Sequence, residues 1–164
     1  MNTTTQQTAV LEMRHIIAAP RERVFAAWTS PEEIQHWFGP ATCRVQSVRL
    51  DLRVGGEYCF DVFSQKIGQT KIRGTYKEIE APEHLVYSWQ CGCDSDLALD
   101  ESLVTVDFID LGSSTEVRLR HELLLNEDVR EDHKHGWIGT FEKLASYLAA
   151  ERSNTENKIQ NSER

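Results

Sequence analysis

The sequence lacks both a hydrophobic run long enough to cross a membrane and a leader that would direct export. Residues 1–8, MNTTTQQT, have neither the basic start nor the apolar core of a secretory signal. No apolar segment approaches the roughly 20 residues that a bilayer-spanning helix needs. We therefore expect a soluble, cytoplasmic protein that does not insert into membranes.

Positive charge is also scarce. The chain has 18 Lys and Arg residues against 26 Asp and Glu residues, which gives a net charge of -8. A surface of this sign repels phosphate backbones and anionic lipids. We therefore expect no nucleic-acid partner.

Cysteine is limited to four residues, and a chain of 164 residues can bury enough surface to fold without disulfides. Cys91 and Cys93 have the spacing of metal ligands, but a closed zinc site needs four ligands and no second pair follows. His133 and His135 are two apart on a predicted helix and point to different faces. We expect no metal and no cofactor, and the sequence leaves the role of Cys91 and Cys93 open.

The first third of the chain predicts one strand and two short helices. Residues 9–17 favour a strand, and Pro20 suits the first position of a helix. Ser30 is a good N-cap for a second helix, with Pro31 at its first position and Glu33 as the capping-box partner. That helix presents Ile34, Trp37 and Phe38 before Gly39 and Pro40 end it.

From Val45 to Glu122 the hydrophobic period is two, which predicts an antiparallel meander with one aromatic-rich face. The opposite face is expected to be solvated and carries Arg73, Lys77, Asp107, Glu116, Arg118 and Arg120. Together these segments predict an α+β helix-grip fold, in which a curved antiparallel sheet of about six to seven strands wraps round a long C-terminal helix.

The last helix is expected from about Glu127 to Ala150, with Trp137 and Phe141 on its apolar stripe. Residues 1–8 are expected to be flexible, residues 9–150 to form the domain, and residues 151–164 to be a disordered polar tail. Gly136 interrupts the helix at a cost of roughly 1 kcal/mol relative to alanine. We interpret it as a position where a ligand or an aromatic ring approaches the backbone.

Five segments, in order, resemble one known family. They are APRERVFAAWTSPEEIQHWFGP at 19–40, VGGEY at 54–58, GTYKEIEAPEHLVYSW at 74–89, VTVDFIDLGSSTEVRLRH at 104–121 and HGW at 135–137. Together they resemble the START-like (SRPBCC) superfamily, and within it the branch related to the activator of heat-shock-protein-90 ATPase. The resemblance covers residues 10–149 and implies a START/Bet v-like helix-grip with a deep apolar cavity between helix and sheet. The superfamily uses this cavity for lipids, sterols, polyketides or aromatic molecules. The chaperone-activating members carry an additional N-terminal domain, for which this chain has no room.

The candidate ligand-binding residues are mostly aromatic residues at core spacing, which are equally compatible with simple packing. They are Trp37, Phe38, Tyr58, Phe60, Tyr76, Tyr87, Trp89, Phe108, His121, Gly136, Trp137 and Phe141. His121 is also a candidate general base, although Glu122 must point to the other face of the strand and cannot orient it. No serine elbow, phosphate-binding glycine loop or carboxylate pair is present, so we assign no catalytic residue.

Three functions remain open. The first is binding of an apolar, lipid-like or aromatic small molecule in the cavity. The second is a protein interaction, for example with a chaperone, through the surface. The third is an enzyme that uses the cavity for proton transfer. Neither the ligand nor the oligomeric state follows from the sequence.

Overall fold

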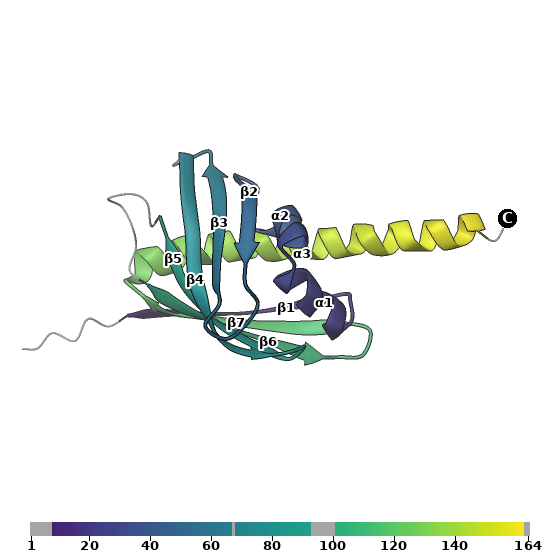
Figure 1. Cartoon of the computed structure of the whole chain (residues 1–164), viewed down its shortest axis with the longest axis horizontal. Coiled ribbons are helices and arrows are strands. Elements are labelled where there is room, and N and C mark those ends of the chain that lie inside the picture. The colour runs from purple at the N-terminus through teal and green to yellow at the C-terminus, as the bar shows by residue number, and fades with distance from the viewer. Residues whose placement is uncertain (1–7, 67, 93–100, 163–164) are drawn as a thin grey trace, which may run out of the picture.

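Two short helices, a seven-stranded sheet and a long last helix make up the structure (Figure 1). The computed structural model describes residues 8–66, 68–92 and 101–162, with side chains as far as residue 151. In chain order the elements are β1 Ala9–Ile17, α1 Arg21–Thr29, α2 Pro31–Trp37, β2 Cys43–Leu50, β3 Glu57–Ser64, β4 Gly68–Glu80, β5 His84–Cys91, β6 Ser102–Asp110, β7 Thr115–Leu124 and α3 Glu127–Ser162.

The sheet is antiparallel throughout, with strand order β1-β7-β6-β5-β4-β3-β2. Strands β2 to β7 form a meander, and β1 completes the far edge by pairing with β7. In Figure 1, β2–β5 stand steeply to β1, β6 and β7, and α3 crosses the bend between them. This arrangement confirms the predicted α+β helix-grip.

The two short helices begin close to where the sequence predicts. Pro20 is the N-cap of α1 rather than its first residue. In α2, Pro31 occupies the first turn and the Ser30 hydroxyl accepts a hydrogen bond from the Glu33 backbone N–H at 3.5 Å. The capping box is not completed, because the Glu33 carboxylate accepts hydrogen bonds from Arg23 and Tyr147 instead.

Burial alternates along the strands as their period-two pattern predicts. In β6, Val104, Val106 and Phe108 are buried against the core. On the opposite face, Arg73 and Arg118 are exposed. The sheet therefore has one apolar inner face that packs against the helices and one polar outer face.

Helix α3 buries the expected stripe, which includes Trp137 and Phe141, and Leu148 is the last buried side chain among those described up to residue 151. The helix continues to Ser162, beyond the end that was predicted near Ala150. Disorder of residues 151–164 stays a prediction. Residues 163–164 and most of the predicted flexible N-terminus, residues 1–7, lie outside the described part. Within that part, no helix combines the length and the apolar content of a membrane span.

The close backbone approach in α3 occurs at Gly139 and not at Gly136. A Cβ on Gly139 would lie 2.9 Å from the Cα of Pro40, closer than packed atoms allow. A Cβ on Gly136 would meet no atom within 4 Å. The prediction that an aromatic ring packs against Gly136 is therefore wrong, and it is Gly139 that lets the segment after α2 pack on α3.

Candidate functional site

The inner face of the sheet holds one continuous cluster of aromatic rings that includes all four tryptophans of the chain. Trp28, on α1, lies at its centre, with ring centroids 4.9 Å from Trp37 and 6.2 Å from Trp137. Its indole N–H donates to the hydroxyl of Tyr87 at 3.3 Å. Trp28 is not among the predicted ligand-binding residues, because its spacing on a helical face indicates only burial.

A void of about 20 Å³ lies within this cluster, and we call it the Trp37 void. A buried water needs about 10–15 Å³, so this space accommodates about one water. Six predicted ligand-binding residues line it, together with Trp28 and Ile34: Trp37, Phe38, Tyr58, Phe60, Tyr76 and Tyr87. The side chains thus occupy most of the space that a ligand would need.

Three tyrosines bring polar tips into this apolar lining. The Tyr58 hydroxyl donates to the backbone carbonyl of Ser88 at 2.5 Å, across Gly74. A Cβ on Gly74 would lie 2.7 Å from the Tyr58 ring and 1.9 Å from the Ser88 oxygen, so only glycine permits this contact. Burial raises the pKa of Tyr58, Tyr76 and Tyr87, which keeps all three as neutral phenols.

His121 is fully buried in a chain of hydrogen bonds whose directions are fixed. The Trp137 indole can only donate, so Nδ1 of His121, 3.2 Å away, is the acceptor. Nε2 therefore carries the proton and donates to the Ser102 hydroxyl at 2.7 Å. Ser102 in turn donates to the backbone carbonyl of Trp89 at 3.1 Å. Burial, with a smaller effect of His133, lowers the pKa of His121 to about 3.

This arrangement has the spacing of a serine–histidine dyad but the opposite chemistry. In a catalytic triad a carboxylate accepts from Nδ1–H, which leaves Nε2 free to take the serine proton. Here Trp137 donates to Nδ1, so Nε2 already carries a proton and cannot accept another. His121 in this arrangement is therefore a satisfied core residue and not a general base.

A second void of about 10 Å³ lies beside this chain, and we call it the His133 void. It is lined by Trp89, Cys91, Ser102, Leu124, Leu125, Val129 and His133. Nδ1 of His133 donates to the backbone carbonyl of Val129 at 2.8 Å, which leaves Nε2 as an acceptor. Burial lowers the pKa of His133 and favours this neutral form. From the sequence, His133 was a candidate only as a metal ligand. No pattern in the sequence indicates that Ser102 belongs to a site.

Five of the predicted site residues line neither void. Phe108 packs on Trp28, with ring centroids 5.7 Å apart. Phe141 stacks on His15 at 5.4 Å, and Gly136 is half-buried on the flank of α3. His121 and Trp137 also line neither void, although Trp137 is in ring contact with Trp89 at 5.4 Å. Their role in ligand binding stays a prediction.

The cysteines give no metal centre in the described residues, where no group of three or more His, Cys, Asp or Glu side chains is arranged to hold a metal ion. Cys93 lies outside the described part, so the predicted Cys91–Cys93 pair stays untested. Cys43 and Cys59 are free thiols.

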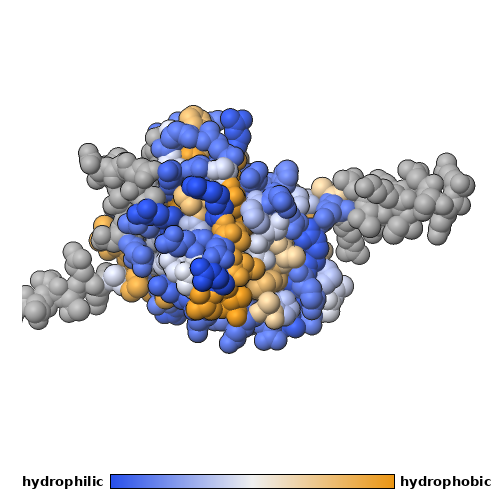
Figure 2. All heavy atoms as spheres, in the orientation of Figure 1, coloured by the Kyte–Doolittle hydropathy of each residue, from blue (hydrophilic) through white to orange (hydrophobic). Residues whose placement is uncertain are grey.

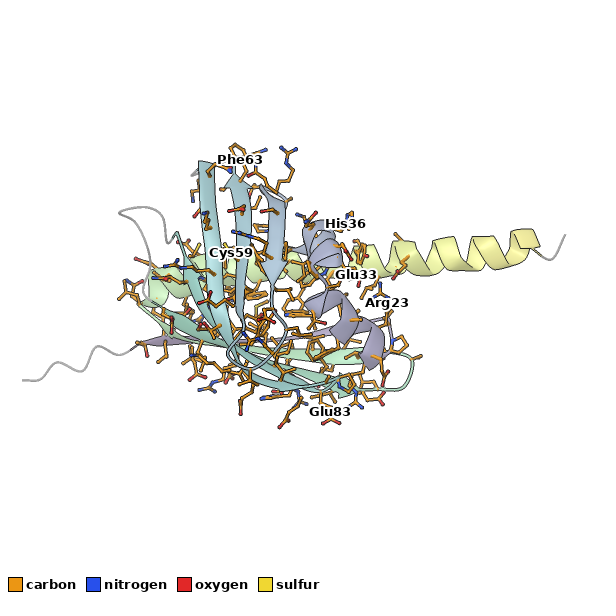
Figure 3. The ribbon with its side chains drawn as sticks, in the orientation of Figure 1. Arg23, Glu33, His36, Cys59, Phe63 and Glu83 are labelled. Carbon is orange, nitrogen blue, oxygen red and sulfur yellow. The ribbon has the colours of Figure 1, made fainter. Side chains whose placement is uncertain are left out.

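An open groove of about 940 Å³ lies on the outer face of the sheet. Arg49, Cys59 and Arg73 occupy one cross-strand row of it, and Figure 3 marks Cys59 on β3. Its lining is mainly polar and faces solvent, so it is unsuited to enclosing an apolar ligand.

An ionic cluster joins the three helices. Arg23 on α1 pairs with Glu33 on α2 and donates to Glu151 on α3 at 2.9 Å (Figure 3). Tyr147 on α3 donates to the same Glu33 at 2.9 Å. The Glu33 carboxylate thus links the short helix α2, which carries Trp37 over the void, to both α1 and α3.

Comparisons with known proteins agree with this geometry. The model of the family described as Activator of Hsp90 ATPase homolog 1-like protein matches residues 18–149. A search of curated proteins gives no significant match.

Solved structures with the same fold come from several bacteria. The AHSA1 protein of Silicibacter pomeroyi is 25% identical with a TM-score of 0.75, over 87% of this chain and 99% of that one. The AHSA1-like protein of Aeromonas hydrophila is 22% identical with a TM-score of 0.71, over 87% and 93%. CalU16 of Micromonospora echinospora is 21% identical with a TM-score of 0.65, over 94% and 85%.

Proposed function

Since this chain belongs to the family of Activator of Hsp90 ATPase homolog 1-like proteins, we propose that it binds a small apolar or aromatic molecule between α2 and the sheet. The fold is one that commonly binds hydrophobic ligands. The ligand would enter the Trp37 void and enlarge it.

One observation carries this proposal: an aromatic lining with polar tips converges on a void beneath a short helix. The void is lined by rings from α1, α2 and three strands, and the Tyr76 and Tyr87 phenols belong to it. Apolar walls with a few oriented polar groups are typical of small-molecule sites. The seven-residue helix α2 is the smallest element that would have to move.

Ligand entry therefore depends on how firmly α2 is held. Its polar contacts are the hydrogen bond from the Trp37 indole N–H to the Ala27 carbonyl at 3.0 Å, the Glu33 contacts with Arg23 and Tyr147, and the hydrogen bond from Gly39 N–H to the Thr140 hydroxyl at 3.1 Å. The Arg23–Glu33 ion pair is partly exposed, and such pairs contribute only about 0–1 kcal/mol. Its loss should loosen α2 without unfolding the domain.

The four indole N–H groups make the test direct, because all four tryptophans belong to the aromatic cluster. A titration with N-phenyl-1-naphthylamine is monitored by NMR of indole-labelled protein. The indole N–H resonances of Trp28 and Trp37 should shift and saturate at one ligand per protein. Arg23→Ala should increase the association rate constant several-fold. Arg118→Ala, which removes an exposed ion pair with Glu116 on the outer face, is the matched control and should leave that rate unchanged. Indole shifts that do not saturate, or an absence of binding, would contradict the proposal.

A second candidate function is a protein interaction through the surface, and the small volume of both voids favours it. The loop between β2 and β3 exposes Leu52 and Val54, with 41% and 63% of their surfaces accessible. Figure 2 shows apolar atoms gathered in a strip between hydrophilic flanks on the face that it displays. The family description suggests an Hsp90-type chaperone as the partner to test.

This candidate predicts a different response to mutation. The double variant Leu52→Ser, Val54→Ser should abolish any stimulation of a purified bacterial Hsp90 ATPase while leaving naphthylamine binding intact. If the wild-type domain gives no stimulation at saturating concentration, the chaperone interaction is contradicted.

A further inference from the structure

The indole N–H of Trp89 is buried and has no hydrogen-bond partner among the described residues. Trp89 is 6% exposed. Buried indole N–H groups usually find an acceptor, because an unpaired one loses its bond to water without compensation. The one described void that Trp89 lines is the His133 void.

The same void also offers an acceptor. Nδ1 of His133 is committed to the Val129 carbonyl, so Nε2 of the neutral ring presents a lone pair. The hydrogen bond to Val129 is the one found for this ring among the described residues, and His133 itself is half-buried. The His133 void is therefore lined by one residue with an unused donor and by another with an unused acceptor.

The two voids lie on either side of one ring contact. Phe38 lines the Trp37 void, Trp89 lines the His133 void, and their ring centroids are 5.8 Å apart. A ligand that separates these two rings would join the spaces. Its apolar body would lie among the rings around Trp37, and its other end would reach Trp89 and His133.

We propose that the ligand carries a neutral hydroxyl group, as a phenol or an alcohol does, and that Trp89 and His133 bind this hydroxyl in the His133 void. A hydroxyl accepts from the Trp89 N–H and donates to His133 Nε2 with the same oxygen atom. A carbonyl or an ether satisfies only Trp89, and a carboxylate would lose its hydration in this apolar setting. This inference rests on the proposed function and adds the chemical class of the ligand.

The test compares three probes of nearly equal size: naphthalene, 2-methoxynaphthalene and 2-naphthol, at neutral pH. Because one well-placed buried hydrogen bond changes affinity by about ten-fold, 2-naphthol should bind at least that much more tightly than naphthalene. 2-Methoxynaphthalene accepts but does not donate, and should be intermediate. The Trp89 indole proton should move downfield with 2-naphthol and not with naphthalene.

Trp89→Phe keeps a ring and removes the donor, so the ratio of the 2-naphthol and naphthalene affinities is measured rather than either affinity alone. That ratio should fall several-fold, toward one. If the variant does not fold, the Trp89 indole shift in the wild-type protein decides. Equal binding of all three probes with no Trp89 shift overturns the hydroxyl site and leaves the proposed function standing. Failure of every probe to bind overturns both.

Discussion

At the scale of single residues, the direction of each hydrogen bond determines what His121 can do. A serine and a histidine 2.7 Å apart suggest nucleophilic catalysis until the third partner is considered. Because the Trp137 indole has no lone pair to offer, Nδ1 must accept, and the basic nitrogen is no longer available. One indole therefore converts a potential catalytic pair into a structural one.

The buried histidine makes stability depend on pH. The pKa of His121 falls from 6.5 in the unfolded chain to about 3 in the folded protein. Between these values only the unfolded state binds the proton, so stability is lost as pH falls from 6.5 toward 3, by up to about 1.4 kcal/mol per pH unit. The pKa of His133 is also lowered by burial, which adds to the effect. Urea unfolding between pH 7 and pH 5 should show this loss.

His121→Gln is the control, because its amide can accept from Trp137 and donate to Ser102 without titrating. For the variant, the free energy of unfolding should depend less steeply on pH. Near pH 5 the difference in slope should correspond to about one proton fewer taken up on unfolding. Equal slopes for the two proteins would show that His121 is not the titrating group.

At the scale of elements, α3 contains two glycines whose roles differ. Gly139 lies against Pro40, whereas the space beside Gly136 is empty. Both cost helix stability in the same way, through the conformational freedom of the unfolded chain. Only the structure shows that one of them is required by packing.

Alanine substitutions separate the two positions. Gly139→Ala should destabilise the protein by about 1–3 kcal/mol, because the Pro40 backbone must move to admit the Cβ. Gly136→Ala should instead stabilise it by about 0.5–1 kcal/mol through helix propensity. Denaturant unfolding of both variants measures this, and a loss of stability in Gly136→Ala would show that the position is constrained after all.

At the scale of the whole molecule, the last turns of α3 extend beyond the sheet and the other helices (Figure 1). Among its side chains described up to residue 151, Leu148 is the last buried one, and Glu151 accepts a hydrogen bond from Arg23 on α1. The domain thus consists of a packed body and a helical extension of its last helix.

Removal of residues 152–164 should therefore change the free energy of unfolding by less than about 0.5 kcal/mol, within the range of ordinary surface changes. Leu148→Ala, inside the body, should cost about 2–5 kcal/mol. Thermal and urea unfolding of the two proteins makes the comparison. A truncation as costly as Leu148→Ala would mean that the extension packs against the body.

Local patterns were sufficient to predict most of the fold. The caps at Ser30 and Pro31, the period-two strands and the stripe on α3 are each set by neighbours in the sequence. The end of α3 was not predicted, because a polar segment without hydrophobic periodicity can continue a helix as well as leave it. The sequence predicted the aromatic residues of the candidate site, except Trp28. It did not predict how much free volume remains between their rings.

The sequence by itself determined the order of the elements, the faces that are buried, and the aromatic character of the core, because these follow from side-chain type and spacing. Only the tertiary structure decided that the rings nearly fill the cavity, that Gly139 meets Pro40, and that Trp137 sets the proton on His121. The physical reason is that packing volume and hydrogen-bond direction depend on atoms brought together from distant segments, and such distances are not encoded in any local pattern.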